Sequence, residues 1–94
     1  MMELFWTPEA TKDREAIYDH IEADNPSAAL ALDELFADNA GHLVNYPYIG
    51  KVGRVSGTRE LIVHRNYMLI YDTSGNMVRI LRVMHAARQW PPSS

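Results

Sequence analysis

Cysteine is absent from this sequence of 94 residues, which excludes disulfide bonds, thiolate zinc sites and a cysteine nucleophile. A chain without disulfides suits a reducing compartment, so we expect the protein in the cytoplasm. Long apolar runs are also absent, since none approaches the roughly 18 residues of a membrane span. Residues 1–3 do not resemble the start of a secretory signal. The sequence therefore predicts neither a membrane protein nor a secreted one.

Signatures of common cofactors are missing as well. The sequence has no P-loop, no glycine pattern of a dinucleotide-binding site and no G-x-S-x-G nucleophile elbow. Its four histidines do not fall at the spacing of metal ligands. We therefore expect no cofactor and no metal site.

The length fits one small domain, because most domains have roughly 100–150 residues. We assign residues 1–90 to this single domain. Residues 91–94 read Pro-Pro-Ser-Ser, which cannot continue a strand, and we expect them to form a disordered tail.

Charge is distributed unevenly along the chain. Residues 1–48 carry two basic and ten acidic side chains, whereas residues 49–94 carry seven basic and two acidic ones. The two halves therefore have formal charges of −8 and +5 within a total of −3. Phosphate binding depends on local charge, so the second half is a candidate nucleic-acid surface. A solvated basic sheet face explains the same pattern equally well.

The first half of the chain reads as a strand followed by two helices. Residues 3–6 are strand-like, and Thr7 can cap a helix that has Pro8 in its first turn. Residues 25–27 end that helix and cap a second one, whose apolar residues between 29 and 43 recur at three- and four-residue steps. Because the link is short, the two helices are predicted to form an antiparallel hairpin.

The second half changes to strand patterns. Residues 45–54 read as an ordered loop anchored by its tyrosines, and strands follow at 58–64, 67–72 and 77–85. The order β-α-α-β-β-β predicts an α+β fold, with a small antiparallel sheet packed on the N-terminal helical hairpin.

Two predicted strand hairpins indicate which side chains lie side by side. A turn at Arg65-Asn66 places His64 opposite Tyr67, and a turn centred on residues 74–75 places Tyr67 opposite Arg82. These three residues would form one row across the sheet. A slip of one residue would break the row.

Two further expectations follow from the same register. Arg59 and Asp72 should form an ion pair on the opposite face. His85 ends the last strand, and strict alternation would put it on the other face from Arg82 unless a bulge turns the chain back.

Each histidine also has an ordinary structural interpretation. His20 lies among acids on the first helix and reads as a solvated surface residue, and His42 near the end of the second helix complements the helix dipole. His64 can occupy a hairpin shoulder, and Tyr67 can be a core aromatic. Only the cluster as a whole indicates a function.

Cleavage of an RNA phosphodiester is the chemistry that such a cluster can perform. A base removes the proton of the 2′-hydroxyl, cations hold the charge that develops on the phosphate, and an acid protonates the leaving 5′-oxygen. Imidazole suits either proton role, and guanidinium suits the phosphate. An aromatic such as Trp90 can stack an unpaired base.

Several segments together resemble the RelE/ParE superfamily of bacterial toxins. They include G-R-V-S-G-T-R-E-L, Y-M-L-I-Y and I-L-R-V-M-H, at residues 53–61, 67–71 and 80–85. Tyr46-Pro47-Tyr48 adds to this likeness. The opening E-L-F-W-T and the closing H-A-A-R-Q-W-P resemble its RelE/StbE branch, which includes the YacB-like proteins.

The resemblance implies particular roles for five residues. His64 and His85 stand where RNA-cleaving relatives carry a catalytic His or Arg, and Trp90 falls near their C-terminal aromatic. Arg59 and Arg82 match positions that supply positive charge. Other candidate RNA-binding residues are basic or aromatic: Lys51, Arg54, Arg65, Tyr67 and Arg88.

The resemblance also implies partners and leaves the target open. RelE-like members cleave messenger RNA on the ribosome without a metal, whereas ParE-like members poison DNA gyrase. An antitoxin neutralises both kinds, so we expect a cognate antitoxin in a toxin–antitoxin hetero-oligomer. The two histidines and the short C-terminal segment favour mRNA cleavage, with gyrase inhibition as the alternative. A third possibility is a degenerate member that retains only antitoxin binding and repression.

Overall fold

The computed structural model describes residues 2–87. The predicted tail at 91–94 and the candidates Arg88 and Trp90 lie outside these residues. The elements, in chain order, are β1 (Glu3–Trp6), α1 (Pro8–Glu22), α2 (Pro26–Asn45), β2 (Lys51–Val52), β3 (Arg59–His64), β4 (Tyr67–Ser74) and β5 (Met77–His85).

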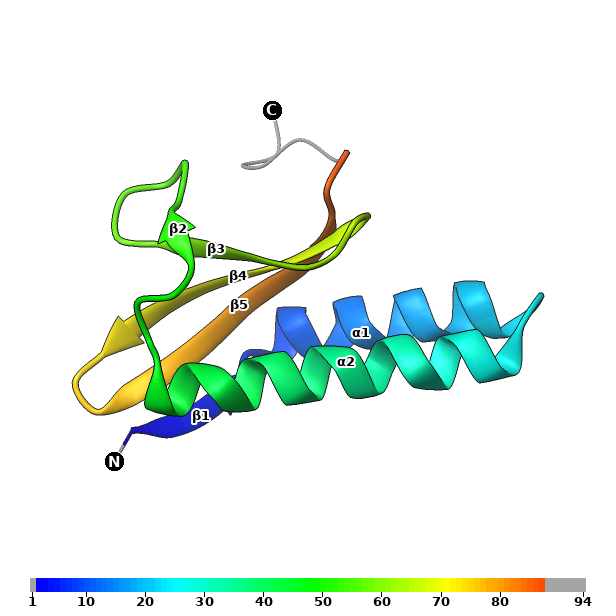
Figure 1. Cartoon of the computed structure of the whole chain (residues 1–94), viewed down its shortest axis with the longest axis horizontal. Coiled ribbons are helices and arrows are strands. Elements are labelled where there is room, and N and C mark those ends of the chain that lie inside the picture. Colours follow the sequence, from blue (N-terminus) through cyan, green and yellow to red (C-terminus); the bar gives the residue numbers. More distant parts are fainter. Residues whose placement is uncertain (1, 88–94) are drawn as a thin grey trace.

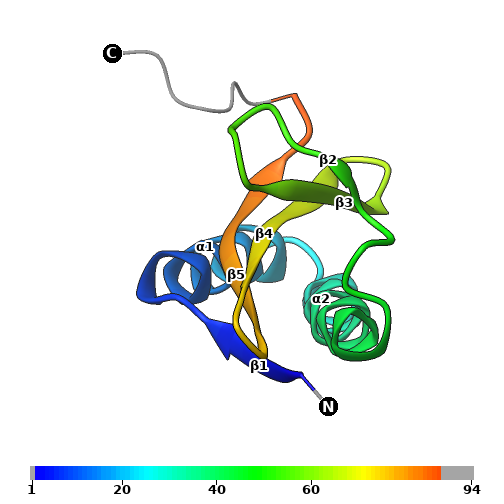
Figure 2. The ribbon, with the colours of Figure 1, turned by 90° about the vertical axis from the view of Figure 1, so that its left-hand side faces the viewer.

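Both helices begin where the sequence predicted. The Thr7 hydroxyl accepts a hydrogen bond from the Ala10 amide, and the Asn25 side chain accepts one from the Ala28 amide. Each cap satisfies an amide that the first helical turn leaves without a partner. The helices lie antiparallel and pack together against the sheet (Figures 1 and 2).

The α+β fold is confirmed, but the sheet is mixed rather than wholly antiparallel. Its five strands lie in the order β1-β5-β4-β3-β2, and β1 pairs in parallel with β5. The helical hairpin separates β1 from the strands that follow, so β1 can join the far edge in this direction. The two-residue strand β2 lies within the segment predicted to be a loop.

The main core lies between the helices and one face of the sheet. Phe36, Ala40 and Leu43 of α2 pack there with Leu69 and Tyr71 of β4. The alternate residues of β4 belong to a second apolar cluster with Met84, because successive side chains of a strand point to opposite faces. Among the described residues no helix is long and apolar enough to cross a membrane.

The loop before β2 is held by the core and not by its own tyrosines. Tyr46 and Tyr48 are 63% and 67% exposed, so their predicted anchoring role is wrong. Instead, the buried Tyr71 hydroxyl donates to the Pro47 carbonyl at 2.8 Å and accepts from the Gly50 amide at 3.0 Å.

The strand register differs from the prediction in both hairpins. In the first hairpin, the pairing of β3 with β4 shifts by one residue between Ile62 and His64, so Arg59 lies opposite Tyr71. His64 lies opposite Tyr67 as predicted, but His85, not Arg82, lies opposite Tyr67 on the other side. The second turn is centred on Gly75-Asn76, and Leu81 is an extra residue in β5 that shifts the pairing. Arg82 lies opposite Ile70 instead.

The predicted ion pair between Arg59 and Asp72 is also wrong. Asp72 lies opposite Arg79, which donates to its carboxylate through Nε at 2.8 Å and Nη2 at 2.6 Å. The centre of the second turn lies one residue later than predicted, which shifts the pairing by two residues and places Arg79 opposite Asp72.

Candidate functional site

Two exposed imidazoles flank one half-buried phenol at the end of the sheet. The ring centroids of His64 and Tyr67 are 6.5 Å apart, and those of Tyr67 and His85 are 5.2 Å apart. Tyr67 also meets Phe36 of α2 edge to face, with 5.8 Å between the ring centroids. The row His64–Tyr67–His85 therefore lies on the face of the sheet that carries the helices.

Tyr67 separates two cavities that open on its two sides. One has a volume of about 430 Å³ and is mostly apolar, and His64 lines it with residues of both helices. The other has a volume of about 210 Å³ and lies between α1 and the end of β5. Its lining includes Asp13, His20, Tyr67, Arg82 and His85. The two imidazoles of the row thus belong to different cavities.

Arg82 is held by a carboxylate of α1. Asp13 accepts from Arg82 Nε at 2.7 Å and from Nη2 at 3.1 Å, and it accepts from the Val83 amide at 3.0 Å. The hydrogen bonds between the Arg82 guanidinium and the Asp13 carboxylate are the main cause that raises the pKa of Arg82 above its ordinary value. Arg82 is therefore fixed at the cavity of His85, with most of its charge balanced by Asp13.

Arg59 does not join the row. Its Nη1 donates to the Gly50 carbonyl at 2.7 Å and to the Tyr48 carbonyl at 3.4 Å, and its guanidinium lies 5.1 Å from the centroid of the Tyr48 ring. These contacts place it against the loop before β2. Arg59 therefore lies apart from the row of histidines, as its predicted place on the opposite face of the sheet implied.

Lys51 and Arg54 gather around a buried carboxylate. Glu60 has no exposed side-chain surface, and its Oε2 accepts from the Arg54 amide at 3.0 Å. Its Oε1 lies 3.6 Å from Arg54 Nε and 4.0 Å from Lys51 Nζ. The negative charge of Glu60 therefore offsets part of the positive charge of Lys51 and Arg54. The candidate Arg65 is exposed in the turn between β3 and β4.

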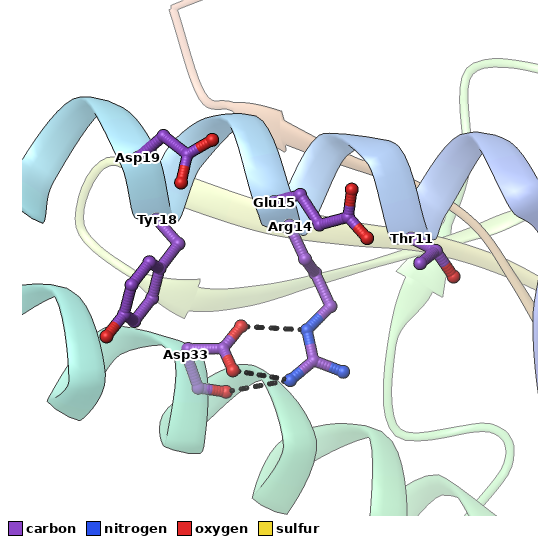
Figure 3. Close-up of a pocket in the computed structure, with 6 residues that line it drawn as sticks. All are labelled: Thr11, Arg14, Glu15, Tyr18, Asp19 and Asp33. Carbon is purple, nitrogen blue, oxygen red and sulfur yellow. Dashed lines mark hydrogen bonds and ion pairs between the residues drawn. The ribbon is translucent and has the colours of Figure 1, made fainter.

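Figure 3 shows a further cavity, between α1 and α2, with a volume of about 450 Å³. Arg14 crosses it and donates to Asp33 through Nε at 2.9 Å and Nη2 at 2.8 Å, while its guanidinium lies 4.4 Å from the Trp6 ring centroid. The carboxylate of Glu22 is the main cause of the raised pKa of Tyr18. Acidic side chains dominate here, so this cavity does not suit a phosphate.

His20 is the residue of the site that sequence reasoning missed. It is exposed, as expected, yet it lines the same cavity as His85. Only the packing of α1 against β5 places both residues at one cavity. The one feature of the sequence that could have indicated this is the spacing of Asp13 and His20, which puts them on one face of the helix. Within residues 2–87 no group of three or more histidines and carboxylates is placed to hold a metal ion.

This helical hairpin on a five-stranded sheet is the fold of the RelE/ParE class of small toxins. A solved structure of the chromosomal ParDE system from P. aeruginosa superposes with a TM-score of 0.81 at 30% identity, covering 90% of this chain and 96% of that one.

Sequence comparison gives the same result. The model of the ParE toxin of the type II toxin–antitoxin system parDE matches residues 4–90. Putative toxin Y4kP of Sinorhizobium fredii is 38% identical over 87 residues, which are 92% of this chain and 90% of that protein. Toxin RelE2 of Caulobacter vibrioides is 34% identical over 88 residues, 94% of this chain and 99% of that protein. The chain belongs to the ParE toxin family, within the RelE/ParE superfamily, and is a toxin of the type II toxin–antitoxin kind.

Proposed function

We propose that this toxin is a metal-independent mRNA endonuclease that acts on the ribosome in the cytoplasm. The observation that supports this activity is the placement of two exposed imidazoles around Tyr67 at one end of the sheet. Imidazole can take a proton from the 2′-hydroxyl or give one to the leaving oxygen. His64 and His85 are the candidates for these proton transfers within the row, and we regard Trp90 as the residue that stacks on a base.

Phosphate contacts in this proposal come from the arginines of the second half of the chain. Arg82 stands at the cavity of His85, and Arg65 follows His64 directly in the β3–β4 turn. Tyr67 is proposed to contact the RNA between the two histidines. Contacts to the RNA backbone farther from the histidines are proposed for four basic residues: Lys51, Arg54, Arg59 and Arg88.

A cognate antitoxin is the proposed partner. One similar structure comes from a ParDE toxin–antitoxin system. An acidic segment of the antitoxin would be attracted to the basic second half of this chain and would cover the RNA site. Such binding would also stabilise a small domain by mass action.

Primer extension on a reporter mRNA in a purified translation system tests the nuclease activity. We expect cuts that require ribosomes and that fall by about 10²–10⁴-fold in His85→Ala, the range for loss of a general acid or base. His42→Ala is the matched control, because it removes an exposed histidine from the far end of α2. Chelation of magnesium, which tests whether cleavage needs a metal, is confined to a control on isolated RNA, since ribosomes require magnesium. Intact mRNA at toxin concentrations that arrest growth would refute the proposal.

Gyrase inhibition is the second candidate, and one observation favours it. Arg82 is paired with Asp13, and Arg59 donates to backbone carbonyls. Both guanidiniums are therefore less available to a phosphate than the sequence suggested. A DNA supercoiling assay with purified gyrase tests this candidate. Inhibition that survives replacement of both His64 and His85, together with uncut mRNA, would establish it.

A further inference from the structure

The cavity of His85 contains a second imidazole, contributed by α1. The residues of α1 that line this cavity recur every three or four positions, so they lie on one face of the helix. The residues of β5 that line it are the last ones of that strand. His20 and His85 both line it, and both are exposed. A cavity of about 210 Å³ is too small for a nucleotide but sufficient for a phosphate and the oxygens bonded to it.

The packing of α1 on β5 explains why these two histidines line one cavity. Asp13 fixes one end of the contact, because it binds Arg82 and the Val83 amide. From Asp13 to His20 the helix rises about 10.5 Å, at 1.5 Å per residue. From Arg82 to His85 the strand rises about 10 Å, at about 3.3 Å per residue. Along its own element, each histidine therefore lies about 10 Å beyond the contact of Asp13 with Arg82, and both line the cavity.

We propose that His20 is a second catalytic imidazole, which acts with His85 on the same phosphodiester. This inference rests on the proposed nuclease activity and assigns the proton-transfer partner of His85 to α1 instead of β3. His64 faces the apolar cavity on the opposite side of Tyr67. An RNA bound over Tyr67 would meet His64 through a base or sugar.

Arg82 completes the site as a phosphate contact. Its Nε and Nη2 are used by Asp13, while Nη1 makes no hydrogen bond within residues 2–87. Nη1 can therefore donate to a phosphate oxygen without breaking the pair with Asp13. Because Asp13 balances the charge of Arg82, a protonated imidazole supplies the net positive charge that attracts the phosphate.

The chemical step balances without any further reactant. One imidazole takes the proton of the 2′-hydroxyl as its oxygen bonds to phosphorus. The bond from phosphorus to the 5′-oxygen breaks, and the other imidazole, protonated at the start, gives its proton to that oxygen. The products are a 2′,3′-cyclic phosphate and a 5′-hydroxyl, with one proton moved from one imidazole to the other.

Single-turnover cleavage on programmed ribosomes tests the assignment. We expect His20→Ala and His20→Gln each to slow cleavage by about 10²-fold or more, the usual contribution of one acid or base. Both variants should keep the unfolding midpoint of the wild type, since His20 is exposed. His42→Ala, which also removes an exposed helical histidine, should cleave like the wild type.

A pH profile separates a catalytic His20 from a structural one. Two imidazoles with opposite proton roles give a bell-shaped profile, and the His20 variants should lose one limb of the bell. The other titratable or charged groups of the cavity are Asp13, Tyr67, Arg82 and His85. An RNA oligonucleotide with 2′-O-methyl groups, which cannot be cleaved, should shift the NMR signals of both imidazoles.

The outcomes distinguish this inference from the proposed function. If His20→Ala cleaves at the wild-type rate and with the wild-type profile while His85→Ala does not cleave, the assignment of His20 is wrong and the nuclease activity stands. If the wild type itself leaves mRNA intact, the nuclease proposal fails and the assignment of His20 fails with it. Loss of one limb in both His20 variants, with folding retained, supports the assignment.

Discussion

Replacing Asp13 by alanine should destabilise the protein strongly, because one carboxylate joins elements almost seventy residues apart in sequence. Asp13 accepts three hydrogen bonds, two from the Arg82 guanidinium and one from the Val83 amide. The side chains of Asp13 and Arg82 are only 17% and 29% exposed. Water can therefore replace few of these contacts.

The expected magnitude follows from two parts. A partly exposed ion pair contributes up to about 1 kcal/mol. The Val83 amide, in a buried residue, would lose its acceptor, which costs about 1–3 kcal/mol. Together they predict a loss of about 3 kcal/mol in the free energy of unfolding. For a domain of this size each kcal/mol lowers the melting temperature by about 4–8 °C, so a fall of about 12–24 °C is expected.

Urea unfolding of the free toxin, followed by circular dichroism, measures this loss. Asp13→Asn should lose less, because its amide oxygen can still accept from Val83. A double-mutant cycle with Arg82→Gln should give a coupling energy of about 1 kcal/mol. Asp38→Ala, at an exposed acid of α2, is the control and should change stability by less than about 0.5 kcal/mol. A loss below about 1 kcal/mol in Asp13→Ala would refute the reasoning.

Four further predictions concern Tyr71 of β4, the loop before β2 and the helix α2. Tyr71→Phe should cost about 1–3 kcal/mol in urea unfolding, because it leaves the Gly50 amide and the Pro47 carbonyl without their partner. Burial raises the pKa of Tyr71 above 10, so the folded state keeps this proton longer than the unfolded state does. Wild-type stability should therefore fall as pH rises beyond 10, and parallel pH curves for wild type and Tyr71→Phe would contradict this. Gly50→Ala should lose about 1–3 kcal/mol, since its Cβ would lie 2.6 Å from the Tyr71 hydroxyl. In Gly41→Ala the Cβ meets nothing within 4 Å, and this helical position should gain about 0.5–1 kcal/mol; equal melting temperatures for the two alanine variants would contradict both expectations.

The parts of the fold that the sequence predicted well depend on local interactions. Thr7 and Asn25 cap helices through amides three residues away. The two-residue turn at Arg65-Asn66 pairs the two strands that lie directly before and after it. The parallel pairing of β1 with β5 is different, because it joins segments more than seventy residues apart. Strand patterns show that a strand exists but not which edge of the sheet it occupies.

The site was predicted correctly where its pairing is set by a short turn and wrongly where its pairing depends on distant parts of the chain. The pairing of His64 with Tyr67 depends on a two-residue turn and is observed. The position of Arg82 depended on counting pairs through a whole hairpin, so a shifted turn and an extra residue both altered it. His20 could be placed only by packing of a helix on a strand, for which the sequence gives no register.

The extra residue Leu81 determines which side chain of β5 reaches the site. The later turn alone shifts the pairing by two residues, which would leave Met84 opposite Tyr67 and turn His85 to the other face. The bulge adds one residue and exchanges the faces, so His85 lies beside Tyr67. It occurs where β1 ends and α1 begins, and there the Thr7 hydroxyl donates to the Leu81 carbonyl at 3.0 Å. The residue that caps α1 therefore also stabilises the bulge, and one local structure fixes both the helix that carries His20 and the strand end that carries His85.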